Sequence, residues 1–198
     1  MKNLVLLIHG IFRQSGVFRK MATHLTDLGY WVHTPDLFHR SGTLGLDQVA
    51  EQVADYVDRT FAPEQSFNLV GLSMGGLVSR YYLQRLGGID RVERFITISS
   101  PHQGTWMAYG FPRTTGLQMR PGSRLIEDLN RDIERLDCID VTSIWTPWDF
   151  IIVPASNSQI AIGNEVRVSV FAHAMMARDD RSIQAVVEAL SRPSRVGK

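Results

Sequence analysis

The segment from Phe67 to Val78 constrains the fold more than any other part of the chain. A short apolar run comes first, a glycine-rich turn with Ser73 at its apex follows, and the next residues have the spacing of an amphipathic helix. The turn fits the pattern G-x-S-x-G, in which a strand enters a helix so sharply that the serine hydroxyl projects outward. Glycines flank that serine because a Cβ would collide where strand and helix pass each other. A serine that simply caps the helix is the alternative interpretation.

The rest of the sequence alternates strand-like and helix-like segments. Apolar runs predict strands at 4–8, 30–34, 92–99, 141–146 and 165–171, and a further short strand from Phe67 into the turn at Ser73. Helical spacing predicts helices at 17–28, 46–61, 125–136 and 183–190, and one from the Ser73 turn to about Leu86. Ser123 and either Asp179 or Asp180 are expected at two of the N-termini. This alternation predicts a three-layer α/β/α sandwich around a mostly parallel sheet of about six strands.

Composition indicates the size and class of the fold. The chain has 198 residues, of which 44% are hydrophobic and 21% are charged, and a chain of this kind can bury one core. Because no Pro-, Ser- or Gly-rich linker divides it, we expect a single domain over residues 1–198. Regular periodicity fails around residues 104–124, where we expect a short irregular segment that forms part of a pocket or a lid.

Charge and cysteine content narrow the range of partners and compartments. The formal net charge is +1 and the arginines are scattered, so nothing indicates a nucleic-acid partner. No stretch approaches the roughly 18 apolar residues of a membrane span, and the run at 4–8 is too short for a signal peptide. The single cysteine, Cys138, is compatible with a reducing compartment. We therefore expect a cytoplasmic protein and no obligate protein partner.

Chemically useful side chains follow the predicted strands. In a parallel α/β sheet, ligands bind at the carboxyl ends of the strands. The residues at these ends are His9-Gly10-Ile11, Ser73, His102, Asp149 and His173. A serine hydroxyl becomes an effective nucleophile when a base accepts its proton, and the base needs an acceptor that orients it.

Ser73, Asp149 and His173 together supply a nucleophile, an orienting acid and a base. Asp137 and Asp140 compete with Asp149 for the role of the acid. Both precede the predicted fifth strand, however, and so lie toward the opposite edge of the sheet. We therefore predict a catalytic triad of Ser73, Asp149 and His173.

The order Ser…Asp…His along the chain is that of the α/β-hydrolases. Further segments that match this family are His9-Gly10, Gly71-Leu72-Ser73-Met74-Gly75-Gly76, Ser100-Pro101-His102-Gln103-Gly104-Thr105, and Val153-Pro154. Over nearly its whole length the chain resembles α/β-hydrolase lipases and esterases, close in size to the small bacterial lipases without a large cap domain. The resemblance implies a minimal α/β-hydrolase fold. Many of these relatives have a histidine at the position of Leu72.

The resemblance also assigns supporting residues. The backbone N–H of Met74 is expected to be one oxyanion donor and that of Ile11 the other, with Phe12 as second choice. His102 competes with His173 as the base, but it precedes Asp149, and in similar sequences its motif belongs to the pocket wall. The expected pocket and supporting residues are His9, Gly10, Leu72, His102 and Trp106.

These residues predict a serine hydrolase that cleaves acyl esters through an acyl-enzyme intermediate. The substrate class is a small acyl ester or a lipid, which allows a transient lipid interface. We expect no cofactor and no metal, since the histidines are dispersed. A thioesterase or an acyltransferase with the same triad is the alternative. A catalytically silent hydrolase-like binding protein is disfavoured because all three triad residues are present.

Overall fold

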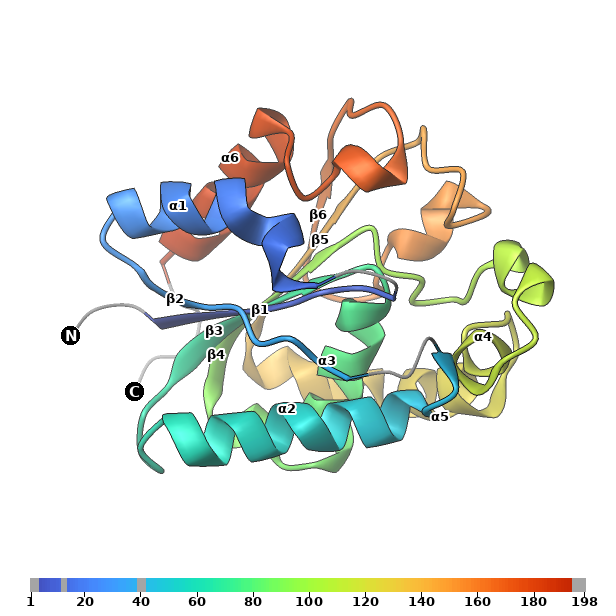
Figure 1. Cartoon of the computed structure of the whole chain (residues 1–198), viewed down its shortest axis with the longest axis horizontal. Helices are drawn as coiled ribbons and strands as arrows, with labels where there is room; N and C mark the ends of the chain where they lie inside the picture. Colours follow the sequence, from blue (N-terminus) through green and yellow to red (C-terminus); the bar gives the residue numbers. More distant parts are fainter. Residues whose placement is uncertain (1–3, 12–13, 39–41, 194–198) are drawn as a thin grey trace.

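Six parallel strands form the centre of the structure, in the order β2-β1-β3-β4-β5-β6 (Figure 1). The computed structural model describes residues 4–11, 14–38 and 42–193. The strands are β1 (Leu4–Ile8), β2 (Trp31–His33), β3 (Phe67–Leu72), β4 (Val92–Ile98), β5 (Asp140–Trp145) and β6 (Asn164–Arg167). Each pair of neighbours is parallel, so the carboxyl ends of all six strands lie at one edge of the sheet.

Helices cover both faces of this sheet (Figure 1). One layer contains α2 (Leu46–Thr60), α3 (Met74–Arg85) and α5 (Arg124–Arg131), and the other contains α1 (Arg19–Asp27) and α6 (Asp180–Ser191). Side chains of β3 alternate between the two cores, with Leu69 in the first and Val70 and Leu72 in the second. The predicted three-layer α/β/α fold is confirmed.

Strands β1 and β3, both inside the sheet, explain why the sequence shows unbroken apolar runs. Every residue of β1 and of β3 is buried, because helices cover both faces of these strands. The edge strands β2 and β6 are shorter and partly exposed. They are also the strands whose ends the sequence predicts least well, since a half-covered strand carries a weaker apolar pattern.

Two predicted elements differ in the structure. The strand expected at 165–171 ends at Arg167, after which Val168 and Val170 turn into the core. The helix expected at 125–136 is interrupted at Asp132, which has a φ of −124°, and continues as a 3-10 helix from Ile133 to Cys138. The Asp132 carboxylate accepts a hydrogen bond from Arg85 at 2.8 Å, which holds the chain in this break.

The remaining elements are short. The helix α4 spans Thr114–Gln118, and the other 3-10 helices are Ser15–Phe18, Gly88–Asp90, Trp106–Gly110, Ala155–Ser158 and His173–Met175. The predicted N-caps are confirmed: Ser123 Oγ accepts from the amide of Ile126, and Asp179 accepts from that of Arg181. A single domain over residues 1–198 stays a prediction.

The irregular segment 104–124 is fastened to the rest of the molecule at both ends. Near its start, the Trp106 amide donates to the Val153 carbonyl at 3.0 Å. Near its end, the Gln118 side chain accepts from the amide of Leu46, the first residue of α2, at 2.6 Å. Between them, the Thr115 hydroxyl donates to the carbonyl of Leu44 at 2.7 Å. Backbone and side-chain hydrogen bonds therefore define the path of this segment.

Candidate active site

Ser73 has a backbone conformation that few residues other than glycine adopt. It stands between β3 and α3 with φ 55° and ψ −124°. Its N–H donates to the Ile98 carbonyl at 2.8 Å, and its own carbonyl accepts from the Gly76 amide at 3.0 Å. A conformation of this kind costs on the order of 1–3 kcal/mol and persists when surrounding contacts enforce it. The outcome is a serine presented at the N-terminus of α3, where the helix dipole favours negative charge.

The glycines around Ser73 permit a close approach of three elements. A Cβ on Gly71 would lie 2.6 Å from the Cα of Gly76, so β3 and α3 meet at backbone distance. A Cβ on Gly75 would overlap the carbonyl oxygen of Ile8. The elbow glycines are therefore required by packing of α3 against β3 and β1.

Asp149 and His173 form a hydrogen-bonded pair at the carboxyl edge. The distance from His173 Nδ1 to Asp149 Oδ2 is 2.7 Å, and the Asp149 side chain is fully buried. Its other oxygen accepts from the amides of Ile151 and Ile152, both at 2.9 Å. Burial raises the pKa of Asp149, but the hydrogen bond and charge of His173 and the two amides outweigh it, so the pKa lies below its usual value. The carboxylate is ionised and positioned to orient the imidazole.

Ser73 and His173 line the same cavity. It has a volume of about 220 Å³, and its walls are Gly10, Ile11, Val17, Leu72, Ser73, Ile151, His173 and Ala174. The structure thus brings together five residues that the sequence singled out from three separate strand ends: Gly10, Ile11, Leu72, Ser73 and His173. Asp149 stands behind His173 rather than in the cavity wall.

The loop after β1 runs directly against Ser73. A Cβ on Gly10 would lie 3.1 Å from the Cβ of Ser73, so a larger residue would press on the serine. His9 holds this loop: its Nε2 accepts from the Leu37 amide at 2.9 Å, which leaves the proton on Nδ1 to donate to the Gly10 carbonyl at 2.9 Å. His9 therefore fixes the position of Gly10 from the side away from the cavity.

The residues expected to supply the oxyanion donors lie next to Ser73. Met74 is the first residue of α3, and the first four amides of a helix have no partner within it. Ile11 lies in the cavity wall. Phe12, the second choice, falls outside the described residues.

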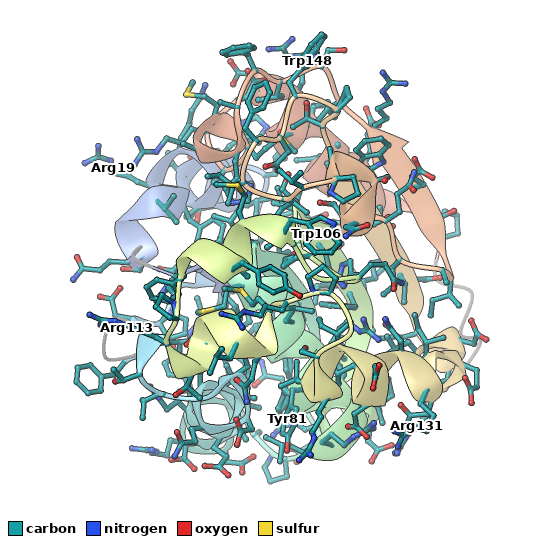
Figure 2. The ribbon with its side chains drawn as sticks, turned by 90° about the vertical axis from the view of Figure 1, so that its right-hand side faces the viewer. Arg19, Tyr81, Trp106, Arg113, Arg131 and Trp148 are labelled. Carbon is teal, nitrogen blue, oxygen red and sulfur yellow. The ribbon has the colours of Figure 1, made fainter. Side chains whose placement is uncertain are left out.

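Like His9, two other expected pocket or supporting residues, His102 and Trp106, are not in the cavity wall. His102 is completely buried, and its Nε2 lies 3.0 Å from the Thr97 hydroxyl. Burial, together with the positive charge of Arg80, holds the pKa of His102 well below its usual value, so this ring is neutral at pH 7. Trp106 is 58% exposed and stacks on Tyr109 at 5.4 Å between ring centroids (Figure 2).

Thr105 is a residue whose role the sequence did not reveal. Its hydroxyl donates to the Ile151 carbonyl at 2.7 Å and accepts from the Val153 amide at 3.0 Å. These bonds bridge residues far apart in sequence and hold the turn whose amides bind Asp149. Val17, Ile151 and Ala174 were also missed as cavity residues. Ile151 and Ala174 stand close after predicted triad residues, which is a usable signal, whereas the helical spacing of Val17 indicates only a core position.

Removing the Thr105 hydroxyl is expected to misplace Asp149. In Thr105→Val, the Ile151 carbonyl and the Val153 amide lose a partner, at a cost of about 1–3 kcal/mol in the free energy of unfolding. We expect kcat to fall about tenfold with a smaller change in KM, since a small shift of a catalytic group is costly. Steady-state kinetics and thermal unfolding of purified variants measure both effects.

Two companion variants separate positioning from stability. Thr105→Ser keeps the hydroxyl and should retain most of the wild-type kcat. Thr115→Val removes a similarly buried bond to the Leu44 carbonyl in the same segment, and it should lose stability without a matching loss of kcat. Equal losses of kcat in Thr105→Val and Thr115→Val would contradict a specific role for Thr105.

Two further features were sought in the part of the chain that the structure describes: a cluster of metal ligands and a membrane-spanning helix. There, no group of three or more His, Cys, Asp or Glu side chains is arranged to hold a metal ion. Likewise, no helix among the described residues has the length and apolar character to cross a membrane. The cytoplasmic location stays a prediction.

Comparison with solved structures gives the fold. An extracellular α/β-hydrolase from a Paenibacillus species is 18% identical, with a TM-score of 0.66 over 98% of this chain and 99% of that one. Lipase B of Aspergillus fumigatus is 20% identical, with a TM-score of 0.80 over 98% of this chain and 53% of that one. The mature lipase BlEst2 of Bacillus licheniformis is 14% identical, with a TM-score of 0.78 over 96% and 93% of the two chains. The predicted α/β-hydrolase fold is confirmed.

A family model extends this likeness to the sequence. No curated protein sequence matches the chain. The model described as palmitoyl protein thioesterase matches residues 4–156, which is most of the chain and includes Ser73 and Asp149 but not His173. The chain therefore belongs to the palmitoyl protein thioesterase family of α/β-hydrolases.

Proposed function

We propose that the protein is a serine hydrolase that cleaves acyl esters through a covalent acyl-enzyme intermediate. The observation that carries the proposal is the 2.7 Å hydrogen bond between Asp149 and His173, beside a cavity that His173 shares with Ser73. A nucleophile, a base and an orienting carboxylate in this relation are the parts that acyl transfer requires.

Each residue has a defined task in the reaction. The Ser73 hydroxyl attacks the ester carbonyl while Nε2 of His173 accepts its proton. Asp149 keeps the other ring proton on Nδ1 and stabilises the imidazolium. The amides of Met74 and Ile11 donate to the oxyanion of the tetrahedral intermediate. The leaving alcohol takes the proton from His173, and water activated by the same ring then releases the acid and restores Ser73.

Thioesters are a second candidate substrate class, favoured by the family to which the chain belongs. The same acyl-enzyme forms from either ester, so the leaving group distinguishes them. A thiol has a pKa of about 8.5 and leaves with little help from a proton donor. Comparing kcat/KM for an oxygen ester and a thioester of the same acyl group decides between the two, and the higher value identifies the substrate class.

Labelling with a fluorophosphonate tests the proposal itself. Such a probe reacts covalently with an activated serine and leaves ordinary serines unmodified. We expect one adduct, located by mass spectrometry on the peptide that contains Ser73, and a parallel loss of ester hydrolysis. Heat-unfolded protein is the control and should not react. An unlabelled native protein, or an adduct on another serine, would contradict the proposal.

A further inference from the structure

Most of the described side chains that line the cavity beside Ser73 are apolar. Apart from Ser73 and His173, its walls are formed by glycine, alanine and branched apolar residues: Gly10, Ile11, Val17, Leu72, Ile151 and Ala174. Apart from Ser73 and His173, the described side chains of this lining carry no polar group, so they favour an apolar part of the substrate. The cavity is therefore suited to the acyl chain of the ester.

The inner end of this cavity is closed. Val17 and Leu72 are 6% and 5% exposed, and both belong to the core between the sheet and the layer of α1 and α6. Phe18 and Met176 of the same core are completely buried. Because protein interiors are close-packed, a chain that enters the cavity stops at Val17 and Leu72 and does not continue beneath α1.

The volume of the cavity limits the length of the chain. A water-sized group occupies about 30 Å³ of liquid volume, and a methylene is of similar size. The volume of about 220 Å³ therefore holds about seven such groups. The carbon and the oxygen of the ester carbonyl account for about two of them, so an acyl group of about six carbons fits. A palmitoyl chain would need roughly twice this volume.

Acyl-chain carbons that extend beyond the cavity lie on a solvent-exposed surface. Ile151 at the cavity wall is 48% exposed, and the neighbouring Phe150 and Phe171 are 60% and 71% exposed. The two phenylalanines contact each other edge to face, with ring centroids 6.3 Å apart. A chain that extends over them stays in contact with water on its outer side, so each additional methylene contributes less than one inside the cavity.

We infer that the acyl site selects short chains of about six carbons and that Val17, at the closed end, sets this limit. The inference rests on the proposed function, since it assigns the cavity to the acyl group of the ester that Ser73 attacks. It distinguishes this protein from an enzyme that accommodates a whole palmitoyl chain inside the protein.

A series of p-nitrophenyl esters from acetyl to dodecanoyl tests the chain-length limit. Each methylene that enters the cavity should raise kcat/KM about fourfold. We expect this fourfold rise to end at about hexanoyl, with a much smaller gain per methylene from there to dodecanoyl. A kcat/KM that continues to rise about fourfold per methylene through dodecanoyl would overturn the inference.

Variants at Val17 test which residue sets the limit. Val17→Ala deepens the cavity and should raise the octanoyl-to-hexanoyl ratio of kcat/KM about fourfold. Val17→Ile shortens it and should lower the hexanoyl-to-butanoyl ratio by a similar factor. Val53→Ala, at a fully buried valine of the opposite core, is the matched control and should keep both wild-type ratios. Unchanged ratios in both Val17 variants would overturn the assignment.

The same experiment separates this inference from the function on which it rests. Hydrolysis with no dependence on chain length would overturn the chain-length limit and leave the proposed function standing. Failure to hydrolyse esters of any length, with no fluorophosphonate adduct at Ser73, would overturn both.

Discussion

Replacing Ser73 with alanine is expected to lower kcat for ester hydrolysis by roughly 10⁴- to 10⁶-fold. The substitution removes the oxygen that would form the acyl-enzyme, while the cavity and the Asp149–His173 pair remain. The rate that remains comes from the hydrogen-bond donors of the oxyanion hole and from substrate binding, without a nucleophile. The measurement is hydrolysis of a short p-nitrophenyl ester, with circular dichroism to verify the fold.

A second serine of the same helix provides the control for this result. Ser79 is completely buried on α3, and its hydroxyl has no hydrogen-bond partner among the residues that the structure describes. Ser79→Ala therefore removes an oxygen of the same kind without a bond, and it should keep kcat within a few-fold of wild type. Turnover near the wild-type value in Ser73→Ala would refute Ser73 as the nucleophile.

The substitution Asp149→Asn is expected to lower kcat by about 10⁴-fold. An asparagine amide can keep accepting from the Ile151 and Ile152 amides through its oxygen. Its NH₂ then faces His173 and donates where the carboxylate accepted. This reversal places the imidazole proton on Nε2, so the ring cannot take a proton from Ser73.

A second aspartate serves as the control that separates orientation of the His173 ring from a general effect of losing one negative charge. Asp137 is exposed and precedes β5, at the opposite edge of the sheet from Asp149. Asp137→Asn changes the net charge by the same amount and should leave kcat unchanged. A similar loss of kcat in both variants, or little loss in Asp149→Asn, would contradict the assignment of Asp149 as the acid.

The lowered pKa of Asp149 also predicts how its contribution to the free energy of unfolding changes with pH. Folding lowers the pKa of Asp149 from its usual value of 3.8, so the unfolded chain takes up a proton at a higher pH than the native protein. The contribution to stability is complete above the unfolded pKa and is lost as pH falls through the lower native pKa. Urea unfolding between pH 3 and 5 should therefore show a weaker pH dependence for Asp149→Asn than for wild type, within the range ~3–5 where aspartates titrate.

The sequence was sufficient to predict the sheet and the turn between strand and helix at Ser73, whereas the catalytic triad stays a prediction. Buried parallel strands such as β1 and β3 appear as unbroken apolar runs, and parallel topology brings all their carboxyl ends to one edge. Ser73, Asp149 and His173 could therefore be grouped without knowledge of any loop. A regular scaffold makes the position of a strand end predictable from the sequence alone.

The details of the cavity could not be predicted in this way. Trp106 and His102 share the carboxyl edge with Ser73, yet one side chain lies in solvent and the other in the core. Their directions depend on bonds between distant segments, such as that from Thr105 to the Ile151 carbonyl. Val17 shows the converse, since its helical spacing indicates a core residue and the structure places it where core and cavity meet.

The positive φ of Ser73 lowers the stability of the fold at the residue that the proposed activity requires. Glycine adopts a φ of 55° without strain, so a glycine at this position would relieve part of the roughly 1–3 kcal/mol stored in the elbow. Variants ranked by melting temperature alone would therefore favour a substitution that eliminates the proposed nucleophile. Any thermostabilisation of this protein needs a turnover measurement at every round, because the residue proposed as the nucleophile is also one of the few non-glycine residues with a positive φ.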